Sequence, residues 1–164
     1  MEKRFQLQLT CLTMPFVAVW IHAVWATHQR QPLLTLPVRP QLFQHLREQA
    51  KRHNIRLTDV GGWIDHVHIL FALAPDQNLA KVMQLLKGES SHWLNQQELT
   101  SIKAFRWQAE YWAGSVSPSG LARVRAYIAG QEEHHRTYSF AEECERLFKG
   151  LGISSSGTVG PSMG

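Results

Sequence analysis

Hydrophobic residues follow two different periods in the first third of the chain. From Phe16 to Thr27, apolar, β-branched and aromatic side chains fill both alternating sets of positions, as is typical of a central strand covered on both faces. Between Pro40 and His53 the apolar residues Leu42, Phe43 and Leu46 recur at helical spacing instead. The pattern therefore predicts a buried strand followed by an amphipathic helix.

The next segments continue this alternation of strands and helices. Residues 54–65 alternate between apolar and polar positions and meet "HVHILFAL" after a break near Asp65, which predicts a hairpin. "PDQNLAKVMQLLKGESSHWLNQ" predicts a second helix, and alternation in residues 103–117 predicts a fourth strand. Ser117 and Pro118 form a good N-cap pair for a third helix that we expect to run to about His134.

The order strand, helix, strand, strand, helix, strand is that of the ferredoxin-like split βαβ arrangement. We therefore predict an α+β fold with a central antiparallel sheet, helices on one face and the third helix, which bears Tyr127, at the C-terminal end. The length suits one domain, which we place at residues 16–150. Residues 1–15 read as an N-terminal extension and residues 151–164 as a Gly/Ser-rich disordered tail.

Composition favours an anionic partner and a reducing compartment. Seventeen Lys and Arg against thirteen Asp and Glu give a net charge of +4. Cys11 and Cys144 lie far apart without a CxxC pattern, so neither a disulfide framework nor a thiolate zinc site is indicated. The basic and apolar N-terminus has features of a signal peptide, but polar residues interrupt it, and no apolar segment approaches the ~20 residues of a membrane helix. We expect a cytoplasmic protein without a membrane partner.

Two histidines in "GGWIDHVHILF" are the first candidate for chemistry. Because side chains alternate faces along a strand, His66 and His68 point to the same side. Two imidazoles on one face can share a cation, although partly exposed strand histidines give the same pattern. In "YIAGQEEHHR", Tyr127 and Gln131 stand four residues apart on one helical face. A half-buried tyrosine beside a surface glutamine is the plainer interpretation of that pair taken alone.

Considered together, these stretches resemble a known family. "DHVHIL" followed by "VSPSGLARVRAYIAGQEEHH" is similar to the single-tyrosine HUH transposases of small bacterial insertion sequences, IS200-like and REP-associated. "VWATHQRQPLL", "LLKGESSHWLN" and "FRWQAEYWAGSVS" resemble the family as well, so that the likeness extends over most of the chain. In conjugative relaxases the tyrosine precedes the histidines, whereas here it follows them.

The resemblance implies a transposase domain that cleaves and rejoins single-stranded DNA at hairpin ends of a mobile element. It implies Tyr127 as the nucleophile, which forms a 5′-phosphotyrosine, and His66, His68 and Gln131 as ligands of Mg²⁺ or Mn²⁺. No nucleotide cofactor is needed, because the phosphotyrosine conserves the bond energy. We also expect association with the bacterial nucleoid and a homodimer, since insertion-sequence relatives can build the site from two subunits.

Other residues are candidates for supporting the site or for contacting DNA. The position of Asp65 at the break between two strands favours a role in the turn, although its carboxylate could also orient an imidazole. His134 and His135 lie about two turns beyond Tyr127 and could reach the metal or a phosphate, or simply end the helix in solvent. Candidate DNA contacts are basic or aromatic: Arg47, Lys51, Arg52, Lys81, Lys87, Arg106, Trp112, Arg123 and Arg125.

Two alternatives stay open at this point. One is a domesticated protein that binds such hairpins without transposition, and the other is a hydrolytic metallonuclease in which water replaces the tyrosine.

Overall fold

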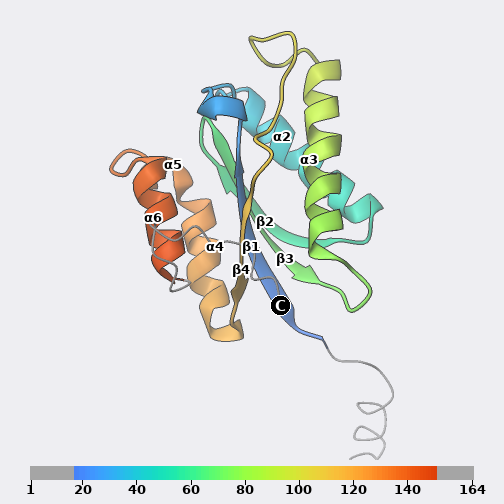
Figure 1. Ribbon diagram of the computed structural model, residues 1–164, viewed down its shortest axis with the longest axis vertical. Coiled ribbons are helices and arrows are strands. Elements are labelled where there is room, and N and C mark those ends of the chain that lie inside the picture. Colours follow the sequence, from blue (N-terminus) through green and yellow to red (C-terminus); the bar gives the residue numbers. More distant parts are fainter. Residues whose placement is uncertain (1–16, 151–164) are drawn as a thin grey trace, which may run out of the picture.

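Four strands form one antiparallel sheet in the order β2-β3-β1-β4 (Figure 1). They are β1 (Val19–Ala26), β2 (Arg56–Gly62), β3 (His66–Leu73) and β4 (Trp112–Val116). This computed structural model describes residues 17–150, so the predicted extension and tail, together with Cys11, lie outside the described residues. The predicted α+β class and the split βαβ order are confirmed.

Two helices cover one face of the sheet. They are α2 (Val38–Arg52) and α3 (Leu79–Gln96), which lie side by side in Figure 1. Inward-facing residues of β1 and β3, among them Trp25, Ile69 and Phe71, pack into one buried core with the apolar stripes of these helices. Asn78 begins α3 as its N-cap, with its side chain accepting from the Lys81 backbone.

The opposite face of the sheet carries the histidines. In the antiparallel register His66 stands opposite Ala26 and His68 opposite Val24 of β1. The C-terminal helices α4 (Leu121–Ala129), α5 (Gln131–His134) and α6 (Phe140–Gly150) lie together on this side of the sheet in Figure 1. The sheet thus separates a hydrophobic core from a polar layer.

The fourth strand is shorter than the alternation of residues 103–117 predicts. Only Trp112–Val116 pairs with β1 as a ladder, and Trp107 makes a single bridge to Thr27. Between them the Lys87 ammonium donates to the carbonyl oxygens of Gln108 and Ala109, each at 2.7 Å. The Gln108 N–H still bonds the Ala26 carbonyl, so the bulge out of the ladder is confined to residues 109–111, where Lys87 bonds the carbonyls of Ala109 and Glu110.

The predicted third helix is also interrupted. It begins with a 3-10 turn (Pro118–Gly120), and the Ser117 hydroxyl bonds that of Ser119 instead of capping the helix. It ends at Gly130, whose dihedral angles (φ −89°, ψ 13°) separate α4 from α5. Helix α6 was not predicted from the sequence.

Among residues 17–150, no helix is both long and apolar enough to cross a bilayer.

Candidate active site

The two histidines of β3 lie at the centre of the polar layer, and both side chains are completely buried. The interpretation as partly exposed strand residues is therefore wrong. As the strand period predicts, His66 and His68 share one face, with ring centroids 5.0 Å apart. Because buried polar groups depend on hydrogen bonds within the protein, the partners of these two rings decide how each ring is oriented and which of its nitrogens carries a proton.

Asp65 orients the ring of His66. Its Oδ1 lies 2.8 Å from Nδ1 of His66, and its Oδ2 accepts from Arg30 at 2.8 Å. Burial opposes the charge of this carboxylate, but the hydrogen bonds from His66 and Arg30 outweigh it and hold the pKa of Asp65 below its ordinary value. Asp65 therefore does more than close a turn: it fixes the tautomer of His66, leaving Nε2 to face the site.

His68 is oriented by a partner that sequence reasoning missed. Nε2 of His22, on β1, lies 3.0 Å from Nδ1 of His68. Burial lowers the pKa of His22 to about 3, assisted by the nearby His68. Burial likewise lowers the pKa of His68 to about 4, so both rings are neutral at neutral pH.

Helix α4 approaches the sheet over a glycine. A Cβ at Gly61 of β2, the residue opposite His68, would lie 2.3 Å from the carbonyl oxygen of Ile128. Because no side chain intervenes, the end of α4 rests directly on the sheet. Tyr127 and Gln131 are thereby brought to the histidines: the Tyr127 ring centroid lies 5.6 Å from that of His68.

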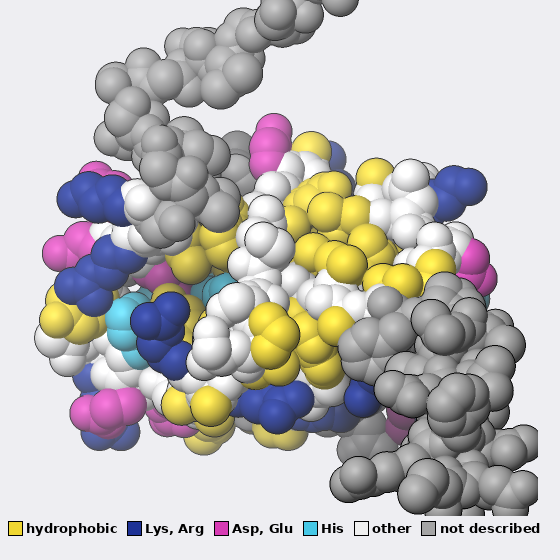
Figure 2. All heavy atoms as spheres, turned by 90° about the horizontal axis from the view of Figure 1, so that it is seen from below, with side chains coloured by type: hydrophobic (Ala, Val, Ile, Leu, Met, Phe, Trp, Pro, Cys, Tyr) yellow, Lys and Arg dark blue, Asp and Glu magenta, His cyan; other side chains and the backbone are white. Residues whose placement is uncertain are grey.

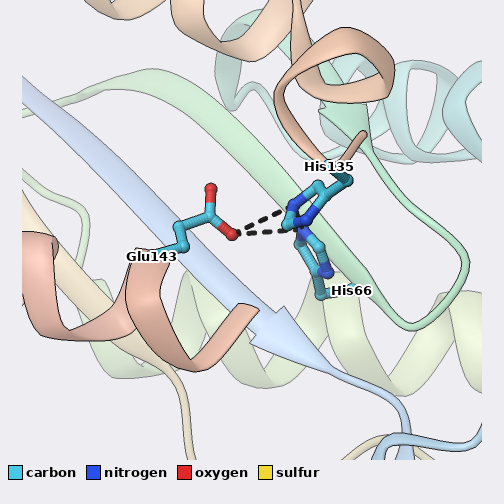
Figure 3. A group of neighbouring side chains, drawn as sticks. All are labelled: His66, His135 and Glu143. Atoms are coloured by element: carbon cyan, nitrogen blue, oxygen red, sulfur yellow. Dashed lines mark hydrogen bonds and ion pairs between the residues drawn. The ribbon is translucent and has the colours of Figure 1, made fainter. Parts of the chain in front are cut away.

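Glu143 of α6 enters the centre of this cluster and was not among the predicted residues. It is 1% exposed. Its Oε1 accepts a hydrogen bond from the Tyr127 hydroxyl and lies 3.2 Å from Nε2 of His68. Its Oε2 lies 3.2 Å from Nε2 of His135 and 3.5 Å from Nε2 of His66, and Figure 3 shows these two rings side by side, facing the carboxylate.

Gln131 and His135 complete the cluster. The Gln131 amide donates to the Tyr127 carbonyl at 3.4 Å and to Glu143 at 3.2 Å, so its Oε1 is turned to the rings of His66 and His135. Nδ1 of His135 lies 3.0 Å from the Tyr138 carbonyl. His134 stands farther out, with Nε2 3.9 Å from Glu143. Of the two candidate histidines, His135 thus belongs to the centre and His134 to its edge.

The charges in the cluster depend on one another. Burial would raise the pKa of Glu143, but the close imidazoles of His135 and His68 lower it far below its usual range. Burial, reinforced by the bond to this carboxylate, raises the pKa of the Tyr127 hydroxyl well above its usual value. At neutral pH the site therefore contains an ionised carboxylate beside a protonated tyrosine.

This set of side chains could hold a divalent metal. One donor atom from each of His66, His135 and Glu143 lies within 4.8 Å of the others. Nε2 of His68 and Oε2 of Glu143 are buried without a hydrogen-bond partner within residues 17–150. Unsatisfied buried acceptors are costly, and a shared cation is one way of satisfying them.

Most of the candidate DNA contacts lie away from this cluster, although the Trp112 ring lies 5.2 Å from that of His22. Five candidates lie on the helices of the far side of the sheet: Arg47, Lys51 and Arg52 on α2, and Lys81 and Lys87 on α3. The others follow later in the chain: Arg106 before β4, Trp112 in β4, and Arg123 and Arg125 in α4. Lys87 is occupied by the bulge carbonyls, and Arg125 pairs with Asp59 at 3.3 Å. Figure 2 shows Lys and Arg side chains spread over one face among acidic and uncharged ones, with no continuous basic patch.

Comparisons with known proteins agree with the fold and identify the family. The family model "Transposase IS200 like" matches residues 16–131. The ISDra2 transposase TnpA of Deinococcus radiodurans is 26% identical over 117 residues, which cover 68% of this chain and 83% of that protein. The transposase for insertion sequence element IS200 of Salmonella typhimurium is 26% identical over 119 residues, 70% of this chain and 78% of the relative.

Solved structures extend the likeness to three dimensions. A crystal structure from Deinococcus radiodurans, described as a transposase, superimposes with a TM-score of 0.55 at 25% identity and covers 72% of this chain and 95% of its own. A REP-associated tyrosine transposase bound to a REP hairpin shares the fold, with a TM-score of 0.54 at 18% identity over 74% of this chain and 72% of that one. Since the family model spans well over half of the sequence, the chain belongs to the family of IS200-like transposases, which are DNA-cleaving enzymes.

Proposed function

We propose that this transposase cleaves and rejoins single-stranded DNA with Tyr127 as its nucleophile. The Tyr127 oxygen attacks the scissile phosphorus and loses its proton, while the bond from phosphorus to the 3′ oxygen breaks and that oxygen leaves as a 3′-hydroxyl. The DNA then carries a 5′-phosphotyrosine, and a second 3′-hydroxyl reverses the reaction.

The observation that carries the proposal is the meeting of Tyr127 and Gln131 with His66 and His68. These four residues come from two segments far apart in the sequence, yet they lie in one cluster with Glu143. A nucleophile beside several neutral metal ligands suits phosphoryl transfer, which depends on positioning and on electrostatic stabilisation.

His66, His68 and Gln131 are the proposed metal ligands, and the unpartnered Nε2 of His68 and the inward Nε2 of His66 fit that role. A bound Mg²⁺ or Mn²⁺ would polarise the scissile phosphate as a Lewis acid. Asp65 holds His66, and His22 holds His68, in the tautomers that present these nitrogens.

The substrate in this proposal is DNA with hairpin ends, supported by the shared fold of the REP-associated transposase that was solved with a REP hairpin. The likeness to insertion-sequence transposases supports a mobile element as its source. Within the single chain described, the Tyr127 hydroxyl bonds Glu143 and its ring lies 5.6 Å from that of His68, which supports a site built from one subunit. The expected homodimer therefore stays a prediction, to be tested by light scattering.

The decisive experiment is a denaturing gel of end-labelled single-stranded DNA that flanks the gene, incubated with the protein and Mg²⁺ or Mn²⁺. We expect a metal-dependent covalent adduct with the wild type and none with Tyr127→Phe. The same DNA annealed as a duplex should be inert.

The other two tyrosines of the chain, Tyr111 and Tyr138, supply matched controls. Tyr111→Phe and Tyr138→Phe should form the adduct as the wild type does. Cleavage that persists in Tyr127→Phe would favour a hydrolytic metallonuclease. Hairpin binding by the wild type without any adduct would favour the domesticated binder.

A further inference from the structure

Four donor atoms converge beside Tyr127. Nε2 of His135 lies 3.1 Å from Nε2 of His66 and 3.1 Å from Oε1 of Gln131. Oε1 of Gln131 is 3.3 Å from Nε2 of His66. Oε2 of Glu143 closes the group, 3.2 Å from the nitrogen of His135 and 3.5 Å from that of His66. These four atoms are called the donor group below.

All members of the donor group are hydrogen-bond acceptors. Nδ1 of His66 faces the Asp65 carboxylate and Nδ1 of His135 faces a carbonyl, so the tautomer that suits each ring has its N–H at Nδ1 and its lone pair at Nε2. Oε2 of Glu143 is buried without a hydrogen-bond partner within the described residues. A proton on one ring would satisfy a single pair of these atoms, whereas a cation satisfies all four.

The spacing of the donor group matches a coordination shell. Atoms that bind one ion at about 2.0–2.2 Å stand about 3.0–3.6 Å from one another. The measured separations run from 3.1 to 3.5 Å. We propose that His135 and Glu143 join His66, His68 and Gln131 as ligands of the metal, and that this set selects a transition metal such as Mn²⁺ over Mg²⁺. The inference rests on the proposed function for the role of the ion.

The preference for a transition metal over Mg²⁺ follows from the chemistry of the donor atoms. Mg²⁺ prefers oxygen ligands and keeps several waters, whereas imidazole nitrogens suit first-row transition metals. The donor group offers two imidazoles, one amide oxygen and one carboxylate. The carboxylate also lowers the net charge of the centre, which strengthens its hold on a divalent ion.

Glu143 links this centre to the nucleophile. While Oε2 belongs to the donor group, Oε1 accepts from the Tyr127 hydroxyl and lies near His68. A carboxylate fixed by a bound ion therefore also fixes the position of the tyrosine oxygen relative to that ion. Glu143 acts here as a positioning residue.

The test is an EPR titration of the full chain with Mn²⁺, in which the signal of the free ion disappears on binding. We expect one bound Mn²⁺ in the wild type, with affinity weakened by at least about tenfold in Glu143→Gln and in His135→Ala. The exposed Glu145 and His53 supply controls, and Glu145→Gln and His53→Ala should bind as the wild type does. An equal concentration of Mg²⁺ should not displace the Mn²⁺.

Wild-type affinity for Mn²⁺ in both Glu143→Gln and His135→Ala, or displacement by equimolar Mg²⁺, would overturn the inference. Circular dichroism confirms that each variant is folded, and pulsed EPR of Mn²⁺ on the wild type detects coordinating imidazole nitrogens without any variant. No nitrogen coupling would contradict the proposed ligand set.

Tyr127→Phe separates the two proposals, because it keeps the donor group and should bind Mn²⁺ normally. A wild type that binds Mn²⁺ as described but forms no DNA adduct would refute the proposed function and leave this inference standing.

Discussion

Gly61 links the stability of the fold to the geometry of the site, so Gly61→Ala should damage both. The new Cβ would lie 2.3 Å from the Ile128 carbonyl oxygen and 2.9 Å from its Cγ2, where ordinary contact begins at 3.4 Å. Helix α4 must therefore move away from the sheet by about 1 Å, since close-packed interiors leave no room to absorb the methyl group.

This displacement sets the size of both effects. Overpacking of this kind costs about 1–3 kcal/mol of unfolding free energy. Tyr127 directly precedes Ile128, so its oxygen moves with the helix, and a shift of about 1 Å in a reacting group costs about 100-fold in rate. Urea unfolding gives the first quantity, and the initial rate of DNA adduct formation gives the second.

Gly88→Ala is the matched control. Nothing lies within 4 Å of a Cβ at Gly88, which is exposed in the middle of α3. Alanine there should raise the unfolding free energy by up to about 1 kcal/mol through helix propensity alone and leave the adduct rate unchanged. If Gly61→Ala keeps wild-type stability and rate, the direct seating of α4 on the sheet is refuted.

Three further outcomes are expected. Asp65→Asn removes the charged acceptor of His66 Nδ1 and should weaken Mn²⁺ binding about 10- to 100-fold, measured by EPR, and wild-type affinity would contradict the orienting role. The unfolding free energy should fall as pH drops from about 6.5 towards 4, because His22 and His68 bind protons in the unfolded chain but, with folded pKa values of about 3 and about 4, not in the native one. At pH 5 this amounts to about 2 kcal/mol per histidine, so a flat urea-unfolding profile between pH 6.5 and 5 would be inconsistent with two buried neutral rings. Asn95→Ala should cost about 1–3 kcal/mol in urea unfolding, since Asn95 bonds both the N–H and the carbonyl of buried Phe105, and no loss would show that these bonds are replaced by water.

Local periodicity was enough to predict half of the site. The period of two in β3 places His66 and His68 on one face, and the spacing of four residues places Tyr127 and Gln131 on another. That these faces meet was implied by the resemblance to a family, because the tyrosine-bearing helix follows the split βαβ unit, whose order does not say which face of the sheet that helix covers. The roles of the four residues came from the resemblance to a family and not from their spacing.

The remaining residues of the site were not predictable from local patterns. His22 looks like any residue of a buried strand, and only the pairing of β1 with β3 gives it His68 as a partner. Glu143 lies in "FAEECERLF", whose alternating acidic and apolar residues indicate at most an amphipathic helix. Its burial depends on the turn after α5, which returns the chain to the sheet, and such a contact has no signature in the sequence.

Helix α6 also affects the order in which the site forms during synthesis, because it follows the strands and α4 in the chain. A polypeptide is made from its N-terminus, so the strands and the tyrosine-bearing helix leave the ribosome before Glu143 does. During synthesis there is thus an interval in which Tyr127, His66 and His68 already exist but the carboxylate that binds the tyrosine hydroxyl does not. The newly made chain thus passes through a form in which the site lacks this carboxylate, and the packing of α6 against the sheet supplies it.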